Sequence, residues 1–471
     1  MKMFVGGEWI DKRQTIPVIN PFDNSVVDTV PKGDRDDVER ALATAVRGAP
    51  TMRKLSGYQR SLILRNAADL LAQRMEELAR TITLEEGKIL AESRIEVGRA
   101  VDIFNLSADE ARRLGGEVVP LDGSPGVTKQ FGFTIRVPCG VVVGISPFNF
   151  PLHLVAHKVA PALAGGNAVI LKPATDTPLS ALKLTEILLE AGVPPEGMQC
   201  LTGSGGEIGD ALCADGRVRK ITFTGSRDVG EHICKVAGLK KITMELGSNS
   251  PVIIMPDADL EKVAAAVAST GFANAGQVCI SAQRVIPLKP IYREFTDLLR
   301  TKVAAITVGN PLQEGVKMGP MVREADAKRV ESWIREAVES GARLVAGGER
   351  TGAILSATVL ADVKPEMKVS RLELFGPAVA LSPAETIDEA ISMANDTNYG
   401  LSAGVFTQNI DWVMRFAREV EAGNIHINWG PQWRVDMMPY GGLKESGFGK
   451  EGPKYAIQEM TELKMIVMHL H

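Results

Sequence analysis

Two side chains of this sequence could act together in covalent catalysis. Cys279 lies in the segment FANAGQVCISAQRV, just after a predicted helix, with no acidic residue beside it. A thiol near a helix end or a group of backbone N–H groups can have a lowered pKa and become a nucleophile. Glu245 follows an apolar strand between Met244 and Leu246. Partial burial there would raise the pKa of its carboxyl group and suit it to be a general base. A buried structural cysteine and a solvated loop glutamate are the plainer alternatives.

The remaining four cysteines are expected to be structural. The chain has five in all, with no CxxC pair and no cysteine and histidine at the spacing of a zinc site. We therefore predict neither a disulfide framework nor a metal site. These other cysteines are Cys139, Cys200, Cys213 and Cys234.

Two glycine-containing segments could hold the phosphates of a nucleotide. In TGSGGEIGD, which contains Gly209, the spacing is a weak match to the dinucleotide-binding pattern. In FTGSRDVG, Gly225 and Ser226 follow a predicted strand and open a helix that contains Gly230. Backbone N–H groups and the serine hydroxyl at such a helix start could bind a pyrophosphate. An ordinary helix N-cap is the alternative.

Alternating strands and helices would position these residues. An amphipathic helix is predicted over 57–81, and short β-branched runs alternate with helical segments from about residue 140. Continuous apolar strands that are each followed by a helix indicate a parallel sheet covered on both faces. A second α/β pattern fills roughly 260–450. The strand-like runs of the first pattern are 141–146, 167–172, 199–203, 220–225 and 251–255.

Composition limits the partners and the location. The 471 residues carry 53 Lys and Arg against 57 Asp and Glu, a net charge of −4, and no basic cluster. This balance argues against a nucleic-acid binder. No apolar stretch reaches the roughly 18 residues needed to span a bilayer, and the N-terminal segment lacks the features of a signal peptide. We expect a cytoplasmic protein with no nucleic-acid or membrane partner.

Two strand-like segments have no obvious partner. One is 116–137, after a Gly-Gly pair, and the other is the C-terminal TELKMIVMHLH. Unpaired strand edges attract another chain, so we expect both segments to pair between the subunits of a homodimer or homotetramer.

Seven motifs in one order resemble the aldehyde dehydrogenase superfamily over essentially the whole chain. They are SPFNFP (146–151), NAVILKPATDTP (167–178), FTGS (223–226), MELG (244–247), GQVC (276–279), LELFGP (372–377) and MPYGGLKESGFG (438–449). The resemblance implies an α/β fold with two doubly wound parallel-sheet domains and a small β oligomerisation arm. It places a dinucleotide-binding domain at 1–115 and 138–247, a catalytic domain at 248–450, and the arm at 116–137 and 451–471.

The resemblance also implies a reaction. Cys279 would attack the aldehyde carbon to form a thiohemiacetal, which loses hydride to the nicotinamide and leaves a thioester. The side-chain amide of Asn149 and the backbone N–H of the cysteine would stabilise the oxyanion. Glu245 would activate the water that hydrolyses the thioester, which favours an acid-forming enzyme over a CoA-acylating one.

An NAD(P) site is implied as well. Lys172 corresponds to the ribose-binding lysine, and Thr175 stands where NAD-preferring members usually place a glutamate that repels the 2′-phosphate of NADP. We therefore predict that NADP is accepted, beside or instead of NAD. The full set of implied cofactor residues is Lys172, Thr175, Gly209, Gly225, Ser226, Gly230, Leu246, Glu373 and Phe375.

The substrate pocket is implied to contain His153, His157 and Arg434, because the closest resemblance is to the lactaldehyde dehydrogenase-like branch. Polar groups in a pocket favour a small polar substrate, here an α-hydroxy aldehyde of the lactaldehyde kind. For the two histidines, the alternative is a place in the core with backbone carbonyls as partners.

Other substrates and one other class of protein remain open. A semialdehyde, or a sulfonated, phosphonylated or phosphorylated aldehyde, would need an anion anchor such as Arg434 or Arg284. Val278 precedes the cysteine where the phosphate-recognising branch tends to have arginine, which argues against a phosphorylated substrate. A non-enzymatic binding or structural protein is the remote alternative, since such proteins normally lose the nucleophile or the base.

Overall fold

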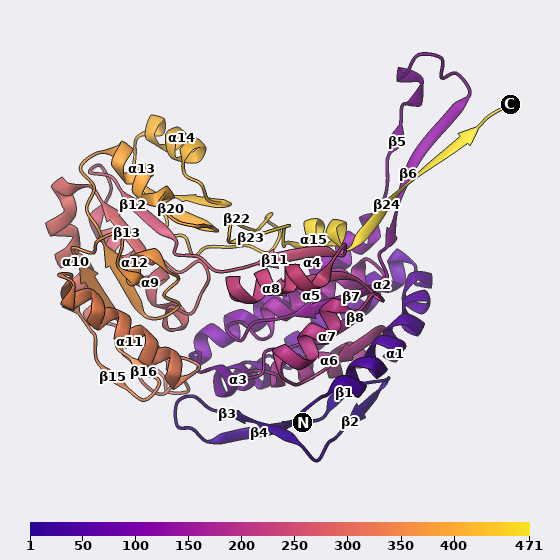
Figure 1. Ribbon diagram of the computed structural model, residues 1–471, viewed down its shortest axis with the longest axis horizontal. Helices are drawn as coiled ribbons and strands as arrows, with labels where there is room; N and C mark the ends of the chain where they lie inside the picture. Colours follow the sequence, from indigo (N-terminus) through magenta and orange to yellow (C-terminus); the bar gives the residue numbers. More distant parts are fainter.

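The computed structural model describes residues 1–471 and consists of two α/β units and a projecting arm (Figure 1). The first unit has an eight-stranded sheet with the order β2-β1-β9-β8-β7-β10-β11-β23. Its five central strands run parallel, and β1, β2 and β23 add antiparallel edges. The strands are β1 (Met3–Val5), β2 (Glu8–Ile10), β7 (Val141–Ile145), β8 (Ala168–Lys172), β9 (Met198–Cys200), β10 (Val218–Thr224), β11 (Lys241–Glu245) and β23 (Gly447–Phe448).

Alternate residues of the central strands face two apolar cores. In β7, Val142 packs into a core that contains residues of α2, α4, α5 and α6, while Val141 and Val143 pack into a core with α1, α7 and α8. Side chains alternate across a strand, so an unbroken apolar run is buried on both faces. The helices are α1 (Arg35–Lys54), α2 (Gly57–Gln73), α3 (Met75–Glu86), α4 (Leu90–Arg113), α5 (His153–Ala164), α6 (Leu179–Glu190), α7 (Asp210–Ala214) and α8 (Arg227–Ala237).

The predicted single helix over 57–81 is wrong in one respect. The chain forms α2 and α3 with a break at Arg74, whose backbone angles (φ −99°, ψ 19°) leave the helical region. The apolar spacing continues across the break, and this is why the pattern alone indicated one helix.

A seven-stranded sheet forms the second unit, with the order β14-β17-β18-β13-β12-β20-β21, in which only β14 is antiparallel. One core packs it against α9, α10 and α11, and another against α13 and α14. Its elements are β12 (Pro251–Ile254), α9 (Leu260–Phe272), β13 (Arg284–Pro287), α10 (Tyr292–Ala304), α11 (Glu324–Glu339), β14 (Arg343–Ala346), β17 (Thr358–Ala361), α12 (Lys368–Arg371), β18 (Ala378–Leu381), α13 (Ile387–Asn395), β20 (Ser402–Phe406), α14 (Ile410–Glu419) and β21 (Asn424–Ile427). The predicted pair of doubly wound parallel sheets is confirmed.

Each sheet has a point at which its strand order reverses. In the first sheet the reversal lies between β7 and β10, and in the second between β12 and β20. Ligands of such sheets bind at the carboxyl ends of the strands near this point. Lys172, Thr224 and Glu245 end β8, β10 and β11, so the fold brings them to one edge of the sheet.

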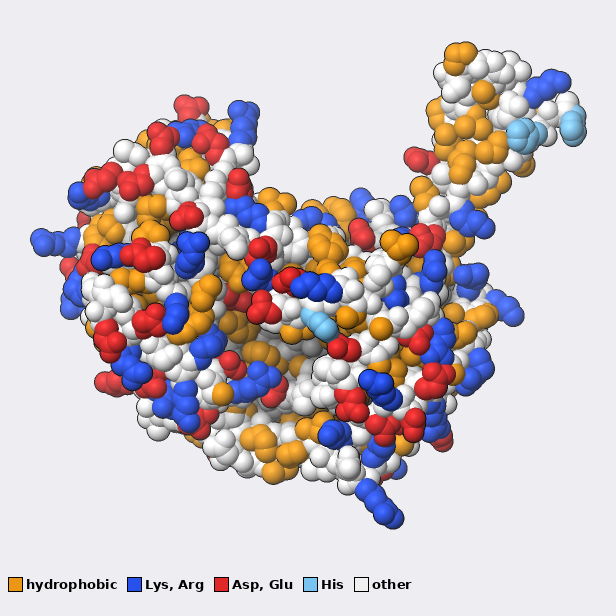
Figure 2. Space-filling view, viewed as in Figure 1, with side chains coloured by type: hydrophobic (Ala, Val, Ile, Leu, Met, Phe, Trp, Pro, Cys, Tyr) orange, Lys and Arg blue, Asp and Glu red, His pale blue; other side chains and the backbone are white.

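The projecting arm is a three-stranded antiparallel sheet of β24 (Thr461–His469), β6 (Gln130–Pro138) and β5 (Val118–Val119). The expectation that the C-terminal tail lacks a partner in its own chain is wrong, because β24 pairs with β6 from Thr461↔Pro138 to His469↔Gln130. Apolar side chains gather along the arm (Figure 2). Before it, α15 (Pro453–Glu459) packs on α4 and α5.

Three small two-stranded sheets complete the chain. Two are hairpins, β3 (Thr15–Ile19) with β4 (Val26–Pro31) and β15 (Arg350–Thr351) with β16 (Ile354–Leu355), and the third pairs strands that are distant in the sequence, β19 (Tyr399–Gly400) with β22 (Leu443–Lys444). None of the helices combines the length and the apolar character that crossing a bilayer would need.

Candidate active site

A cavity of about 360 Å³ lies where the carboxyl ends of β10 and β11 meet the second unit. The first unit contributes residues of α4, the start of α5 and the ends of two strands, and the second contributes the loop after α9 and the segment before β22. The polar and charged lining includes Lys88, Glu92, Glu96, Arg99, His153, Thr224, Glu245, Asn274, Cys279, Gln432, Arg434, Tyr440 and Glu451.

Cys279 lines this cavity from the loop after α9. The loop turns sharply because Asn274 and Ala275 have positive φ angles of 49° and 53°, and Gly276 follows at 69°. A Cβ on Gly276 would lie 2.1 Å from the carbonyl oxygen of Gly376, so only glycine fits. Burial raises the pKa of the Cys279 thiol to about 12. The expected lowering of this pKa is therefore wrong, because desolvation outweighs any helix-end effect and the thiol needs a base.

Glu245 meets the cavity at the end of β11. Its side chain is 3% exposed, and neither carboxyl oxygen has a hydrogen-bond partner. Burial, together with the negative charge of Glu451, raises the pKa of Glu245 well above its usual value. Buried polar atoms are rarely left unpaired, so these two oxygens suit a water or a substrate atom. The predicted partial desolvation of Glu245 is thus present.

Behind Glu245 lies a chain of buried ion pairs. Nζ of Lys158 donates to the Thr224 hydroxyl at 2.6 Å and lies 3.4 Å from the Glu451 carboxylate. The other oxygen of Glu451 accepts from Nη1 of Arg434 at 3.0 Å. Burial opposes ionisation of Glu451, but the nearby His157 and the two cations hold the pKa of its carboxyl below the usual value. Because Glu451 has cationic partners and Glu245 has none, only Glu245 is left free to accept a proton.

Asn149 contacts the loop that carries Cys279. Its side-chain Nδ2 donates to the carbonyl oxygen of Gln277 at 2.8 Å, two residues before Cys279. The backbone carbonyl of Asn149 accepts from Nζ of the buried Lys88 at 2.7 Å and from Nδ2 of Asn274 at 3.2 Å. These contacts tie the Asn149 turn to the GQVC loop.

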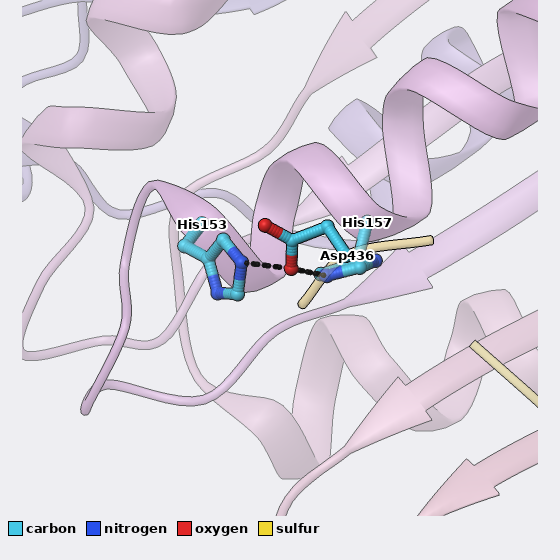
Figure 3. A group of neighbouring side chains, drawn as sticks. All are labelled: His153, His157 and Asp436. Atoms are coloured by element: carbon cyan, nitrogen blue, oxygen red, sulfur yellow. Dashed lines mark hydrogen bonds and ion pairs between the residues drawn. The ribbon is translucent and has the colours of Figure 1, made fainter. Parts of the chain in front are cut away.

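His153 and His157 lie one turn apart on α5, and both rings point to the same carboxylate (Figure 3). Oδ1 of Asp436 is 2.9 Å from Nε2 of His153 and 3.1 Å from Nε2 of His157. The alternative of backbone carbonyl partners for these rings is wrong. His153 lines the cavity, whereas His157 lies behind Asp436 and Arg434 and does not. Burial lowers the pKa of both rings, that of His157 to about 4, so both are neutral at pH 7.

The same three side chains have the composition of a metal site, since their ligand atoms lie within 4.8 Å of one another. However, Nη2 of Arg99 is 2.6 Å from Oδ1 of Asp436, and Nη2 of Arg434 is 2.8 Å from Nε2 of His157. Two guanidinium groups at the ligand atoms would repel a cation. The geometry favours a hydrogen-bonded network over a metal centre.

Gly225 and Ser226 connect β10 to α8. The Ser226 side chain makes no capping hydrogen bond to the first turn of α8. A Cβ on Gly230 would lie 2.5 Å from a methyl group of Leu246, which shows how closely α8 packs on the end of β11. An uncapped helix start at a strand end is suited to a phosphate.

Lys172 ends β8 and Thr175 follows it, on the same edge of the sheet. Burial lowers the pKa of Lys172 to about 8, and its Nζ donates to the Pro173 carbonyl at 2.9 Å. The Thr175 hydroxyl donates to the Gly203 carbonyl at 3.1 Å. Gly209 ends a helical turn where an added Cβ would meet no atom within 4 Å, so packing does not require glycine there.

Glu373 and Phe375 belong to a small crevice beside the main cavity. One carboxyl oxygen of Glu373 accepts from the backbone N–H of Ser248 at 3.0 Å, and burial raises the pKa of Glu373 to about 7. Phe375 has a positive φ of 47°, and its ring meets Phe148 edge-on at 5.8 Å. Val278 lines both the crevice and the cavity, so a group bound in the crevice would lie beside the segment that carries Cys279.

The proposed alternative anchor Arg284 does not reach the cavity. Its guanidinium in β13 donates to the backbone carbonyls of Asn249, Met393 and Ala394. Arg99 and Tyr440 do line the cavity, although the sequence did not single them out. Tyr440 stands within the motif MPYGG, which could have drawn attention to it. Arg99 lies on the amphipathic helix α4, where nothing in the sequence distinguishes it from a charged residue on the surface.

The family model described as "Aldehyde dehydrogenase family" matches residues 9–466. A 3-sulfolactaldehyde dehydrogenase of Priestia aryabhattai is 48% identical over 468 residues, covering 99% of this chain and 98% of the relative. A lactaldehyde dehydrogenase of Methanococcus aeolicus is 40% identical over 471 residues, covering 99% and 100%.

Solved structures of aldehyde dehydrogenases have the same fold as this chain. Aldehyde dehydrogenase 21 from Physcomitrella patens, in complex with the reaction product succinate, superposes with a TM-score of 0.97 at 39% identity, covering 99% of this chain and 98% of that one. A glyceraldehyde-3-phosphate dehydrogenase from Methanocaldococcus jannaschii, complexed with NADP, gives 0.94 at 36% identity, covering 98% and 100%. With a family model and relatives that span nearly its full length, the chain belongs to the aldehyde dehydrogenase family.

Proposed function

We propose that this protein oxidises a small polar aldehyde, an α-hydroxy aldehyde of the lactaldehyde kind, to its carboxylic acid with NADP or NAD. The observation that carries the proposal is the buried, unpartnered carboxylate of Glu245 in the same cavity as the Cys279 thiol. A nucleophile and a free base in one desolvated space are what acyl chemistry requires. In this proposal the first unit holds the nucleotide and the second carries the nucleophile.

The cofactor would lie along the edge formed by β8, β10 and the crevice. The uncapped start of α8 fits a pyrophosphate, and Lys172 fits a ribose. Thr175 leaves room for a 2′-phosphate that a carboxylate would repel. Glu373 and Phe375 face the crevice that leads to Val278. Bound there, a nicotinamide would supply the hydride acceptor for the oxidation.

The protein's own groups would carry the remaining steps. The thiol proton of Cys279 passes to Glu245, and the sulfur forms a bond to the carbonyl carbon while the C=O π electrons move to oxygen. The side-chain amide of Asn149 and the backbone N–H of Cys279 stabilise this oxyanion, each contributing on the order of 3 kcal/mol. Glu245 then releases the thiol proton to solvent water and, deprotonated again, takes a proton from the water that attacks the thioester, and the sulfur leaves as thiolate.

A second candidate substrate is an α-hydroxy aldehyde with an anionic tail, such as a sulfonate. The guanidinium of Arg99 lines the cavity, is 26% exposed and binds only Asp436, so its Nη1 is available to an anion. The sulfolactaldehyde relative and the succinate complex support this candidate by analogy.

A substrate panel tests both candidates. We would assay lactaldehyde, 3-sulfolactaldehyde, succinic semialdehyde and propanal with NADP and with NAD, following the absorbance of the reduced nicotinamide.

Two substitutions test the assigned residues. Cys279→Ser should abolish turnover and keep nucleotide binding, and full activity in that variant would overturn the mechanism. Arg99→Met should raise KM for the sulfonated aldehyde about tenfold or more. Arg94→Met, on the same helix but paired with Glu76 at the surface, is the control.

We also propose that the arm joins subunits into a homodimer or homotetramer. β21 is the free edge of the second sheet, with Trp429 and Trp433 43% and 49% exposed beside it. Large exposed aromatic side chains next to an open strand edge favour pairing with another chain. The apolar arm of a second copy has the matching chemistry. Sedimentation of the intact protein would decide the number of subunits.

A further inference from the structure

Tyr440 places a hydroxyl beside the nucleophile. Its oxygen lies 3.3 Å from Sγ of Cys279, and that sulfur is the only hydrogen-bond partner of the hydroxyl. The side chain is 3% exposed and packs with Val278, Ile280 and Leu401. A buried hydroxyl whose single partner is a sulfur atom is satisfied only while that contact persists.

Two groups fix the ring of Tyr440. Its backbone N–H and carbonyl form a bridge to Glu451, with N···O distances of 3.2 and 2.7 Å. The guanidinium of Arg434 stacks on the ring, 3.9 Å from its centre, and is itself held by Glu451 and His157. A cation over an aromatic face attracts the ring, so this stacking and the backbone bridge hold the hydroxyl in place beside the sulfur.

The protonation state of the sulfur decides what this contact does. A neutral thiol can donate to the tyrosine oxygen, but a thiolate can only accept, and it is a charged acceptor. Hydrogen bonds to a charged form favour that form. The hydroxyl thus opposes the desolvation that burial imposes on the Cys279 thiolate.

We propose that Tyr440 is a further catalytic residue, whose hydroxyl donates a hydrogen bond to the Cys279 thiolate and thereby supports formation of the nucleophile. The thiol proton leaves to the base, the tyrosine keeps its own proton, and the hydrogen bond to sulfur weakens as the S–C bond forms and the charge moves to oxygen. The inference rests on the proposed function, which supplies the role of Cys279.

Alkylation of the thiol tests this without any substrate. Tyr440→Phe removes the hydroxyl and keeps the ring on which Arg434 stacks. Iodoacetamide would be added over a range of pH, and the Cys279 peptide would be followed by mass spectrometry, with Cys279→Ser identifying it. At pH 8 the variant should react about tenfold more slowly, and the same ratio should hold across the pH range in which the protein stays folded.

A matched control is Tyr292→Phe. The Tyr292 hydroxyl donates to Asp362 at 2.7 Å in the second unit, outside the cavity, so its loss should leave alkylation unchanged. Equal or faster alkylation of Tyr440→Phe would overturn the proposal, because it would mean that the thiol donates to the tyrosine.

Two further measurements separate a failure of this proposal from misfolding of the variant and from a failure of the proposed function. If Tyr440→Phe melts well below the wild type, replacing all tyrosines by the more acidic 3-fluorotyrosine should accelerate alkylation, and no acceleration would refute the donor role. Alkylation does not depend on aldehyde turnover. An inactive enzyme whose Cys279 reactivity still depends on Tyr440 would contradict the proposed function and leave the tyrosine contact standing.

Discussion

Replacing Glu245 by glutamine separates catalysis from stability. Neither carboxyl oxygen makes a hydrogen bond, so Glu245→Gln removes no native contact. It deletes a carboxylate whose ionisation burial and Glu451 already disfavour. We expect the free energy of unfolding to change by less than about 1 kcal/mol. A general base typically contributes about 10²- to 10⁴-fold, so kcat should fall by that factor, or about 2.7–5.4 kcal/mol of barrier.

The pH profile gives the same substitution a second signature. Glu245 acts as a base only when deprotonated, and its pKa is raised, so wild-type kcat should fall on the acid side with an inflexion well above 4.5. Below that pKa the carboxyl is protonated and cannot accept a proton. In Glu245→Gln this inflexion should disappear. Initial rates between pH 5 and 9, with nucleotide binding measured separately by fluorescence, would check both effects.

Glu451→Gln is the matched control for burial. Glu451 is as buried as Glu245, but it pairs with Arg434 at 3.0 Å, both side chains being 5% exposed or less. Breaking a buried ion pair costs about 3–5 kcal/mol, so this variant should melt several degrees lower. If Glu245→Gln destabilised the protein as much, or lost less than tenfold in kcat, the assignment of Glu245 as the free base would be refuted.

Three further outcomes are expected. Thr175→Glu should lower kcat/KM for NADP relative to NAD about a hundredfold, roughly 2.7 kcal/mol, in parallel initial-rate assays; an unchanged ratio would show that Thr175 does not face the 2′-phosphate. Asp436→Asn should lower the melting temperature, because it removes the anion between Arg99 and two buried histidines. Removing residues 462–471 should reduce the sedimenting mass, and an unchanged mass would exclude the arm as the subunit contact.

Motif order and strand periodicity predicted the fold and the edge at which the site lies. Lys172 and Glu245 were expected at strand ends, and they end β8 and β11. This succeeds because an apolar run followed by a helix has few solutions other than a parallel strand with a crossover. The two sheets with their reversal points then follow from the number and order of such runs.

Contacts over long sequence separations could not be predicted in this way. Asp436 is far along the chain from His153 and His157, and no local pattern pairs an aspartate before MPYGG with two histidines of α5. The pKa of Cys279 was expected to fall but is raised, because the helix-end argument omits the desolvation that the folded cavity imposes. β24 was expected to lack a partner for the same reason, since its partner β6 lies far back in the sequence.

The buried charges around the cavity explain why one carboxylate is free. Three neighbouring carboxylates each have a cation, and the pairs are Glu96 with Lys88, Glu451 with Arg434, and Asp436 with Arg99. Glu245 has no such bond, and burial together with the charge of Glu451 raises the pKa of its carboxyl well above the usual value.

The ion pair between Arg99 and Asp436 opposes the binding of an anionic substrate. A sulfonate or carboxylate tail that binds Arg99 must share that guanidinium with Asp436, which two histidines also hold in place. Both rings are neutral at pH 7, so they supply dipoles and no net charge to offset a second anion. Because the pKa of both histidines is lowered, the rings stay neutral from pH 8 to pH 5 and add no charge that would tighten binding of a sulfonated substrate in this range. The anion must therefore depend on Arg99, so Arg99→Met should raise KM for the sulfonated aldehyde and leave KM for an uncharged α-hydroxy aldehyde unchanged, and KM measured for both aldehydes in the two proteins distinguishes the substrate classes.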